Sequence, residues 1–372
     1  MSAEERRRRI LETVRQRGTM RVTELGAELG VAPVTARRDV EALAGRGLVR
    51  RVHGSVSWPG HTEETQGASA SAFVVGSGSG SGSGPVLGMV VPSAAYYFAA
   101  IVRGAQAAAS AAGARLALGI SGYQRSEDGI QVDRLLSSGV DGLLITPSWE
   151  PDAPVAAQAD HFLALGVPCV LVERRVSATA AAAEMDRVCS DHTHGAFLAV
   201  RHLVSLGHRR IALAAHLSPT ASLVRAGYLA SLALLELGEP PVPIIDTYPA
   251  EANPEGMDAA LERLINAVHD DGVTAVLVHN DEDAIKIVQS LADRGVQVPG
   301  DLSVIAYDNE VAALADTPLT AVSPPKYEVG TAAVELLLSR LSAAPDPAAS
   351  ARRHLDLLPR LVVRDSCGPL AP

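Results

Sequence analysis

The chain has 372 residues, which is long for one ordinary domain and suits two or three. Hydrophobic residues make up 47% and charged residues 20%, so disorder along the whole chain is excluded. The three widely spaced cysteines (Cys169, Cys189 and Cys367) fit neither a disulfide framework nor a zinc site of paired cysteines. The net charge of −10 combines two opposite parts: residues 1–57 carry 12 arginines against 7 acidic residues, and the remainder carries 20 basic against 35 acidic residues. A small basic module joined to a large acidic one indicates a nucleic-acid-binding head and a body that does not itself bind polyanions.

The hydrophobic segments predict neither a signal peptide nor a membrane span. The basic run at residues 6–9 is followed by only two apolar residues before Glu12. The longest apolar stretch, residues 87–102, is interrupted by Pro92 and falls short of the roughly 20 residues that a span needs. We therefore expect a cytoplasmic protein that does not enter a membrane.

The first 57 residues predict three helices and a β-hairpin. Residues 3–17 form an Arg-rich amphipathic helix, and a second short helix is expected over residues 23–29. After a tight turn, a third helix begins near Pro33, which suits the first helical position. Residues 48–56 are then typical of a hairpin wing, so the sequence predicts a winged helix-turn-helix.

Six polar side chains of this head are candidates for DNA contact. Thr35 and Arg37 are expected to face base edges, and Arg38 could either reach phosphate or pair with a neighbouring acid. The hairpin residues are available for phosphate. The candidates are Thr35, Arg37 and Arg38 on the third helix, and Arg50, Arg51 and His53 on the wing. A solvated surface charge is the alternative for each arginine, and it is less plausible for the cluster.

The head resembles a known family. Residues 31–40 (VAPVTARRDV) and 51–54 (RVHG) closely resemble the DeoR-type winged-helix family, and the likeness covers about residues 4–57. The departures are Ala32, where the family usually has Ser or Thr as helix cap, and Ser55, where it usually has a second Gly. The resemblance implies a DNA-binding domain over residues 1–57.

Residues 58–84 are expected to be a flexible linker. Their last part, residues 76–84, alternates glycine and serine, which offers nothing to bury and has high backbone entropy. A phosphate-binding loop would lead into a helix, whereas this run leads to Pro85 and a predicted strand.

From Pro85 onward, short apolar runs alternate with helical patterns. The runs expected to form buried strands are 86–91, 115–120, 142–146, 169–173, 211–214, 273–279 and 302–306. Such alternation predicts parallel sheets with crossover helices, and residues 85–372 exceed what one sheet normally holds. We therefore expect an α/β body of two lobes, with its functional residues after the carboxyl ends of the strands.

Three separate segments of the body carry a second resemblance. They are VDGLL at residues 140–144, the run from Asp191 to LGHRRI at 206–211, and HND at 279–281 followed by LSVIAYD at 302–308. Together they resemble the sensor domain of the LacI family over about residues 85–365. The resemblance implies a two-lobed, periplasmic-binding-protein-like (type I) fold with a small-molecule effector, usually a sugar or nucleobase, between the lobes. It also implies an oligomer, most simply a homodimer whose two heads read two half-sites.

The candidate ligand-binding residues follow the predicted strands. They are Tyr96, Tyr97, Trp149, Glu173, Arg225, Asn280, Asp281 and Asp308. Aromatic faces beside carboxylates and amides suit a sugar, which has an apolar face and many hydroxyls. Core packing is the alternative for the aromatic residues, above all for Tyr96.

Three of the polar candidates rest on the LacI resemblance. Asp308 matches the ligand-binding acid of the family and is the best single candidate. Asn280 and Asp281 match its Asn-Asp pair, although Asp281 could instead cap the following helix.

The other two charged candidates depart from the family pattern. Glu173 stands where the family usually has Asp, with a salt bridge to Arg174 or Arg175 as the alternative. Arg225 lies two residues before Gly227, whereas the family usually places this arginine three residues before; on a helix, that offset turns the side chain by about 100°.

Motifs of enzymes and metal sites are weak in this sequence. The cluster at residues 191–194 (DHTH) lacks a third metal ligand at a supporting spacing, and His208 lies in a turn typical of the fold. No catalytic triad, phosphate loop or dinucleotide fingerprint is visible. We predict a transcriptional regulator, most simply a repressor, that binds operator DNA and a sugar-like effector and needs no cofactor. The alternatives are a sugar-modifying enzyme that carries a DNA-binding head and a ligand-blind DNA-binding protein.

Overall fold

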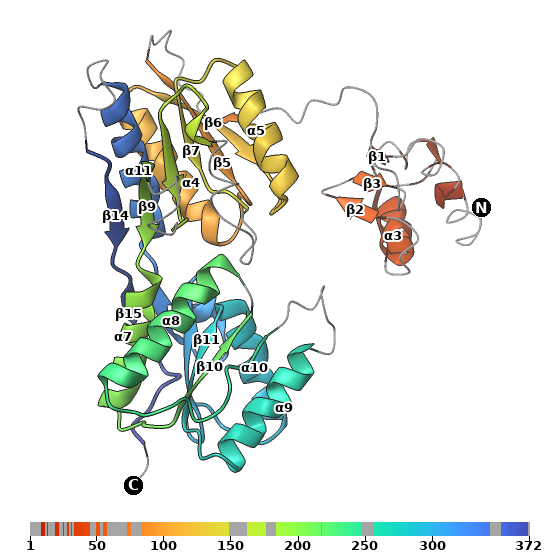
Figure 1. The fold of residues 1–372 in the computed structure, drawn as a ribbon. Helices are drawn as coiled ribbons and strands as arrows, with labels where there is room; N and C mark the ends of the chain where they lie inside the picture. Colours follow the sequence, from red (N-terminus) through yellow and green to blue (C-terminus); the bar gives the residue numbers. More distant parts are fainter. Residues whose placement is uncertain are drawn as a thin grey trace. The chain divides into compact units, whose positions relative to one another are not determined.

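The computed structural model divides the chain into two compact units, Met1–Ser71 and Ala72–Pro372, each described here by itself (Figure 1). In the first unit, the structure describes residues 9–11, 13, 19–21, 25, 28–29, 31, 33–44, 50–52 and 55–57. In the second, it describes residues 73–75, 84–148, 162–175, 184–216, 218–247, 256–342 and 351–370.

The first unit has the predicted third helix and wing. Helix α3 (Pro33–Ala44) begins at the expected proline, and strands β2 (Arg50–Val52) and β3 (Ser55–Ser57) form the antiparallel hairpin. A further strand, β1 (Thr19–Arg21), pairs with β3 and was not predicted. The core of the unit contains Ile10, Leu25, Ala36, Val40 and Leu43.

Lobe 1 of the second unit is built on a mostly parallel sheet, as predicted. In the described residues, its strand order is β14-β9-β8-β7-β5-β6-β4. The strands are β4 (Phe73–Val75), β5 (Val86–Val91), β6 (Arg115–Ile120), β7 (Gly142–Ile145), β8 (Cys169–Val172), β9 (Asp186–Ser190) and β14 (His354–Leu357). Helices α4 (Tyr97–Ala111) and α11 (Lys326–Leu341) cover one face and α5 (Arg125–Ser137) the other (Figure 1).

Strand β4 lies inside the stretch expected to be linker. It pairs antiparallel with β6, with Phe73 opposite Leu118. The short apolar run Phe-Val-Val adds a strand at the open edge of the sheet. The run was not predicted as a strand because it is short and lies among Gly- and Ser-rich residues.

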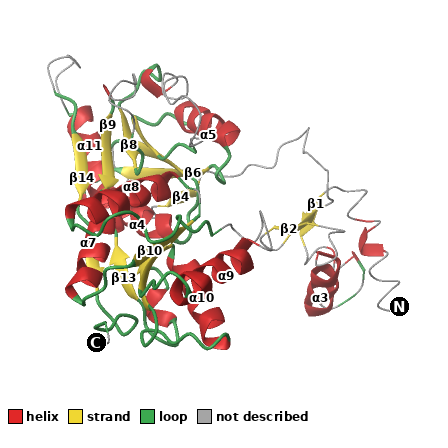
Figure 2. Ribbon diagram, turned by 60° about the horizontal axis from the view of Figure 1, so that its bottom comes forward, coloured by secondary structure: helices red, strands yellow, loops and turns green. Residues whose placement is uncertain are grey.

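Lobe 2 has the strand order β10-β11-β12-β13-β15 in the described residues, and its first four strands are parallel. The strands are β10 (Ile211–Ala215), β11 (Ala275–His279), β12 (Ser303–Tyr307), β13 (Thr320–Ser323) and the antiparallel β15 (Arg360–Val362). The helices are α7 (His192–Ser205), α8 (Pro219–Leu234), α9 (Gly256–His269), α10 (Asp281–Asp293) and the 3₁₀ turn η2 (Ala312–Leu314), seen from a second side in Figure 2. None of the helices described is long and apolar enough to cross a membrane.

The described chain passes between the lobes at three places. It crosses from β9 to α7, returns from β13 to α11, and crosses again from β14 to β15. Because the helices that follow parallel strands begin at the carboxyl edge of a sheet, α4, α8 and α10 all start where the two lobes face each other.

Helices α4 and α11 approach each other unusually closely. A Cβ atom added to Gly104 would lie 2.0 Å from the carbonyl oxygen of Tyr327, and one added to Gly330 would lie 2.0 Å from that of Ile101. Only glycine permits this approach, which fixes α11, the returning segment, against lobe 1.

Candidate functional site

A cleft of about 350 Å³ lies between the lobes of the second unit. Its walls come from the carboxyl ends of strands and the first turns of helices in both lobes. The lining residues are Tyr96, Tyr97, Phe98, Tyr123, Glu173 and Arg174 from lobe 1, and His216, Ser218, Pro219, Thr220, His279, Asn280 and Asp308 from lobe 2. Five of the eight predicted ligand residues therefore border one cavity: Tyr96, Tyr97, Glu173, Asn280 and Asp308.

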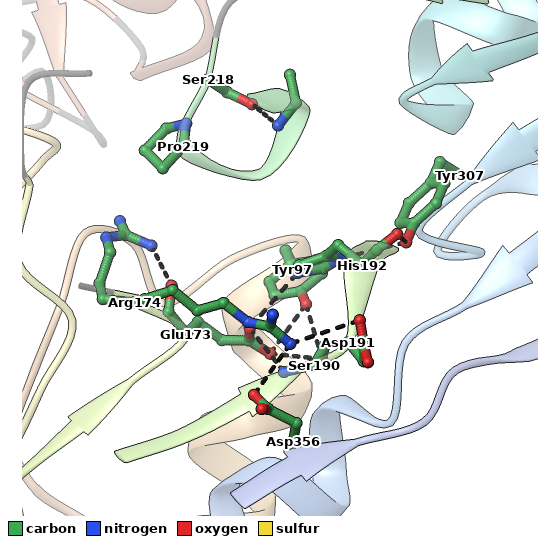
Figure 3. A network of polar contacts seen from close by, with 12 residues as sticks. Tyr97, Glu173, Arg174, Ser190, Asp191, His192, Ser218, Pro219, Tyr307 and Asp356 are labelled. Atoms are coloured by element: carbon green, nitrogen blue, oxygen red, sulfur yellow. Dashed lines mark hydrogen bonds and ion pairs between the residues drawn. The ribbon is translucent and has the colours of Figure 1, made fainter. Parts of the chain in front are cut away.

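Glu173 is the centre of a polar network that borders the cleft (Figure 3). Its carboxylate accepts hydrogen bonds from the hydroxyl of Tyr97 (3.0 Å) and from the backbone N–H and hydroxyl of Ser190 (3.1 and 2.7 Å). Nε2 of His192 lies 3.5 Å from the same carboxylate. The predicted alternative, a salt bridge to Arg174 or Arg175, is not formed in the described residues; Arg174 instead donates to the backbone carbonyl of Glu173.

The network fixes the protonation of Glu173 and Tyr97. Burial acts to raise the pKa of Glu173, but the hydrogen bond and charge of His192 and the bonds from Ser190 hold this pKa below its ordinary value. Burial, followed by the charge of Glu173, raises the pKa of Tyr97 well above its ordinary value. Glu173 is thus an ionised acceptor and Tyr97 a neutral donor.

Asp308 differs from Glu173 because its charge is poorly compensated. It directly follows β12 on the lobe 2 wall, is 4% exposed, and has no hydrogen-bond partner for Oδ1 among the described residues. Burial raises its pKa to about 7, although the charge of Lys326 acts in the opposite direction. A buried polar atom without a partner costs about 1–3 kcal/mol, so this oxygen is suited to accept a hydrogen bond from a ligand.

The backbone around the cleft is strained. Four lining residues other than glycine have positive φ angles: Tyr96 (48°), Tyr123 (60°), Glu173 (53°) and Asp308 (85°). Each such residue costs on the order of 1–3 kcal/mol and persists only where the surroundings hold it, and such residues cluster at functional sites.

Asn280 and Asp281 have different roles. Asn280 caps α10, because its side chain accepts a hydrogen bond from the backbone N–H of Asp283. Asp281 does not line the cleft; Oδ2 accepts the backbone N–H groups of residues 310, 311 and 312, and Oδ1 accepts the hydroxyl of Tyr96. That last bond joins the two lobes.

Arg225 and Trp149 stand apart from the cleft residues. Arg225 does not line the cleft: it is paired with Asp246 and donates to the carbonyl of Ala215 (2.9 Å), in keeping with the offset of its position. Trp149 lies outside the described residues.

Sequence reasoning missed eight lining residues. They are Phe98, Tyr123, Arg174, His216, Ser218, Pro219, Thr220 and His279. Arg174 and His279 neighbour predicted residues, and His216 directly follows β10, so the rule that sites lie after strands could have found them.

The crossing segments are tied together by charge. Arg175 lies 3.4 Å from Asp191, which follows β9, and 3.0 Å from Asp356 of β14. We call Arg175, Asp191 and Asp356 the hinge cluster. Asp191 also caps α7 by accepting the backbone N–H of His194 (3.0 Å), so the DHTH run has a structural role. The described residues contain no group of three side chains able to hold a metal ion.

The DNA-binding candidates lie on α3 and the wing. Thr35 is half-buried and Arg38 is exposed on α3. Arg37 lies on α3 and Arg50 and Arg51 on β2, while His53 lies outside the described residues.

Comparison with known proteins matches both parts of the chain. Residues 6–61 match the family model of a DeoR-like helix-turn-helix domain, and residues 200–367 match that of a periplasmic binding protein-like domain. The HTH-type transcriptional repressor PurR of Vibrio parahaemolyticus is 29% identical over 286 residues, which cover 75% of this chain and 80% of that protein. The repressor CytR of Escherichia coli strain K12 is 27% identical over 249 residues, covering 66% of this chain and 69% of the other.

Solved structures share the fold. A LacI family transcriptional regulator from Enterococcus faecium with bound ribose gives a TM-score of 0.61 at 24% identity and covers 77% of this chain and 100% of its own. The lac repressor dimer bound to operator and the anti-inducer ONPF gives 0.61 at 24% identity, covering 77% and 94%.

A winged DNA-binding head and a two-lobed sensor in one polypeptide define a one-component transcriptional regulator. The chain combines a DeoR-like helix-turn-helix domain with a periplasmic binding protein-like domain, and over the second unit its fold is similar to that of LacI family transcriptional regulators.

Proposed function

We propose that this regulator is a repressor whose affinity for operator DNA is set by a sugar held between the lobes of the sensor domain. The observation that carries the proposal is the cleft itself, which places two ionisable acids, an amide and three tyrosines around one cavity. Carboxylates and amides bind hydroxyls, and aromatic rings cover the apolar face of a sugar.

The relatives support the same function. PurR and CytR are repressors, and the structure of the Enterococcus faecium regulator contains bound ribose. By analogy, the regulator acts in the cytoplasm as a homodimer. A dimer suits this function because two heads bound to two half-sites multiply a weak single-head affinity.

Thermal-shift screening of the full chain against mono- and disaccharides, sugar phosphates and nucleosides tests the sensor. A ligand at 100 times its Kd stabilises the native state by about 2.7 kcal/mol, and Asp308→Ala is expected to abolish this shift. Asp293→Asn changes an exposed aspartate on α10 and serves as the matched control. No shift with any compound would contradict the proposal.

Operator selection from random DNA duplexes, with and without the stabilising sugar, tests the regulation. Arg38→Ala on the exposed face of α3 is expected to weaken DNA binding while leaving the thermal shift intact. DNA affinity that does not respond to the sugar would contradict the proposed control.

A further inference from the structure

The imidazole of His279 is a buried group that the predicted site does not use. It ends β11, lines the cleft and is 4% exposed. Its Nδ1 has no hydrogen-bond partner among the described residues. Since an unpaired buried nitrogen is costly, the position favours a partner that arrives from the cleft.

Neighbouring histidines are engaged, in contrast to His279. His216 lies 3.4 Å from Oδ2 of Asp283 through Nδ1, and His192 lies between Glu173 (3.5 Å) and the hydroxyl of Tyr307 (3.2 Å). The ring of His279 packs between those of His216 and Tyr307, with centroids 5.3 and 5.5 Å away. These ring contacts fix the orientation of His279 without using its Nδ1.

His279 is neutral in this environment. Burial, followed by the positive charges of His216 and His192, lowers its pKa to about 3, although Asp283 acts in the opposite direction. A neutral imidazole offers one N–H donor and one lone pair, which suits a hydroxyl and gives no charge to attract a phosphate.

Asp308 is the second open group, and it lines the same cleft as His279. Strands β11 and β12 are parallel neighbours, with Val278 opposite Ala306, so His279 lies opposite Tyr307 and Asp308 lies one residue beyond that pair at the same edge. Neighbouring strands are about 4.8 Å apart, so one ligand in the cleft can contact both residues.

We propose that His279 binds one hydroxyl of the bound sugar while Asp308 accepts the hydrogen bond of the next, so that the cleft selects a vicinal diol. This inference rests on the proposed sugar-binding function and adds a specificity-determining residue to it. Free ribose and a ribonucleoside both carry such a diol, and the shared chemistry is the ribose ring with two adjacent hydroxyls.

Calorimetric titration of the full chain with matched ligands tests the proposal. The probes are D-ribose and adenosine, each with its 2-deoxy and 3-deoxy forms, so the parent that binds identifies the source of the diol. For the wild type, removal of the hydroxyl that His279 reads is expected to weaken binding about 10-fold.

His279→Phe keeps a ring between His216 and Tyr307 but has no polar atom. This variant is expected to bind the parent and that deoxy form equally, because the lost hydroxyl no longer has a partner. His279→Asn returns a polar atom close to the position of Nδ1 and is expected to restore part of the discrimination. A merely structural histidine would change both affinities together and leave their ratio unaltered.

The outcomes separate the two proposals. Equal discrimination by the wild type and His279→Phe, or no discrimination by the wild type, overturns the role of His279. If neither ribose nor adenosine binds the wild type but another sugar of the thermal-shift panel does, the inference about His279 falls and the proposed function stands; if no compound of that panel binds, both fail. If a diol probe binds and only Asp308→Ala abolishes binding, the inference about His279 also falls while the proposed function stands. Melting temperatures without ligand identify a variant that fails to fold, in which case His279→Asn alone decides through its ratio.

Discussion

Replacement of Asp308 by asparagine is expected to stabilise the sensor domain above neutral pH. Asparagine keeps the shape of the side chain and tolerates the positive φ of 85°. It removes a carboxylate whose pKa burial raises from an ordinary 3.8 to about 7. At about 1.36 kcal/mol per pKa unit, this difference of roughly 3 units corresponds to about 4 kcal/mol.

The direction of the pH dependence is set by the number of protons that Asp308 binds in the folded and unfolded states. Between pH 4 and 7, folded Asp308 holds a proton that the unfolded chain has released, so the stability of the wild type falls as the pH rises. Asparagine carries no charge at any pH. The advantage of Asp308→Asn is therefore expected to grow by about 3 kcal/mol between pH 5 and pH 8.

Urea unfolding of the ligand-free full chain at pH 5, 6, 7 and 8 measures this difference. Asp293→Asn, which removes an exposed carboxylate on α10, is expected to give a curve parallel to that of the wild type. If Asp308→Asn also runs parallel to the wild type, then Asp308 is already ionised at low pH and our account of its environment is wrong. The same substitution is expected to weaken sugar binding, which would make Asp308 a residue retained for function at a cost in stability.

Two further substitutions test the parts that hold the lobes. Gly330→Ala places a methyl group 2.0 Å from the Ile101 carbonyl oxygen and is expected to lower the free energy of unfolding by about 3 kcal/mol. Gly129→Ala in α5 meets nothing within 4 Å and is expected to raise that free energy by about 0.5–1 kcal/mol. Urea unfolding of both variants measures the contrast. Arg175→Gln breaks the partly exposed hinge cluster and is expected to lower the free energy of unfolding by about 1 kcal/mol in low salt and by less in 1 M NaCl. A difference between variant and wild type that does not change with salt would contradict this.

The buried strands could be predicted from the sequence because a parallel strand covered on both faces is a continuous apolar run. All seven predicted strands are present, with ends within two residues of those expected. Most strands of the second unit that were missed lie at an edge or carry charges; the exception is β13 (Thr320–Ser323), a four-residue uncharged strand between β12 and β15. β9 begins with Asp186, whose carboxylate pairs with Arg340 (2.6 Å), a partner 154 residues away that no local pattern can supply.

The sequence predicts that site residues follow the ends of the strands, but it does not predict which of the residues after a strand lines the cleft. Glu173 and Asp308 border the cleft because each directly follows a parallel strand. Asp281 is one residue beyond Asn280, and its carboxylate turns to the backbone N–H groups of residues 310–312 instead. A shift of one position along the chain thus separates a residue that lines the cleft from one that supports its wall. Which of the two a residue becomes depends on backbone turns formed by distant segments.

The segment after β8 connects the cleft to the hinge. Glu173 accepts two hydrogen bonds from Ser190, the last residue before the first crossing, and Arg174 forms part of the cleft wall. Arg175 binds Asp191 and Asp356, which belong to two different crossing segments. Three consecutive residues thus contact the end of β9, the cleft and the hinge cluster, and the positive φ of 53° at Glu173 persists because these bonds hold it.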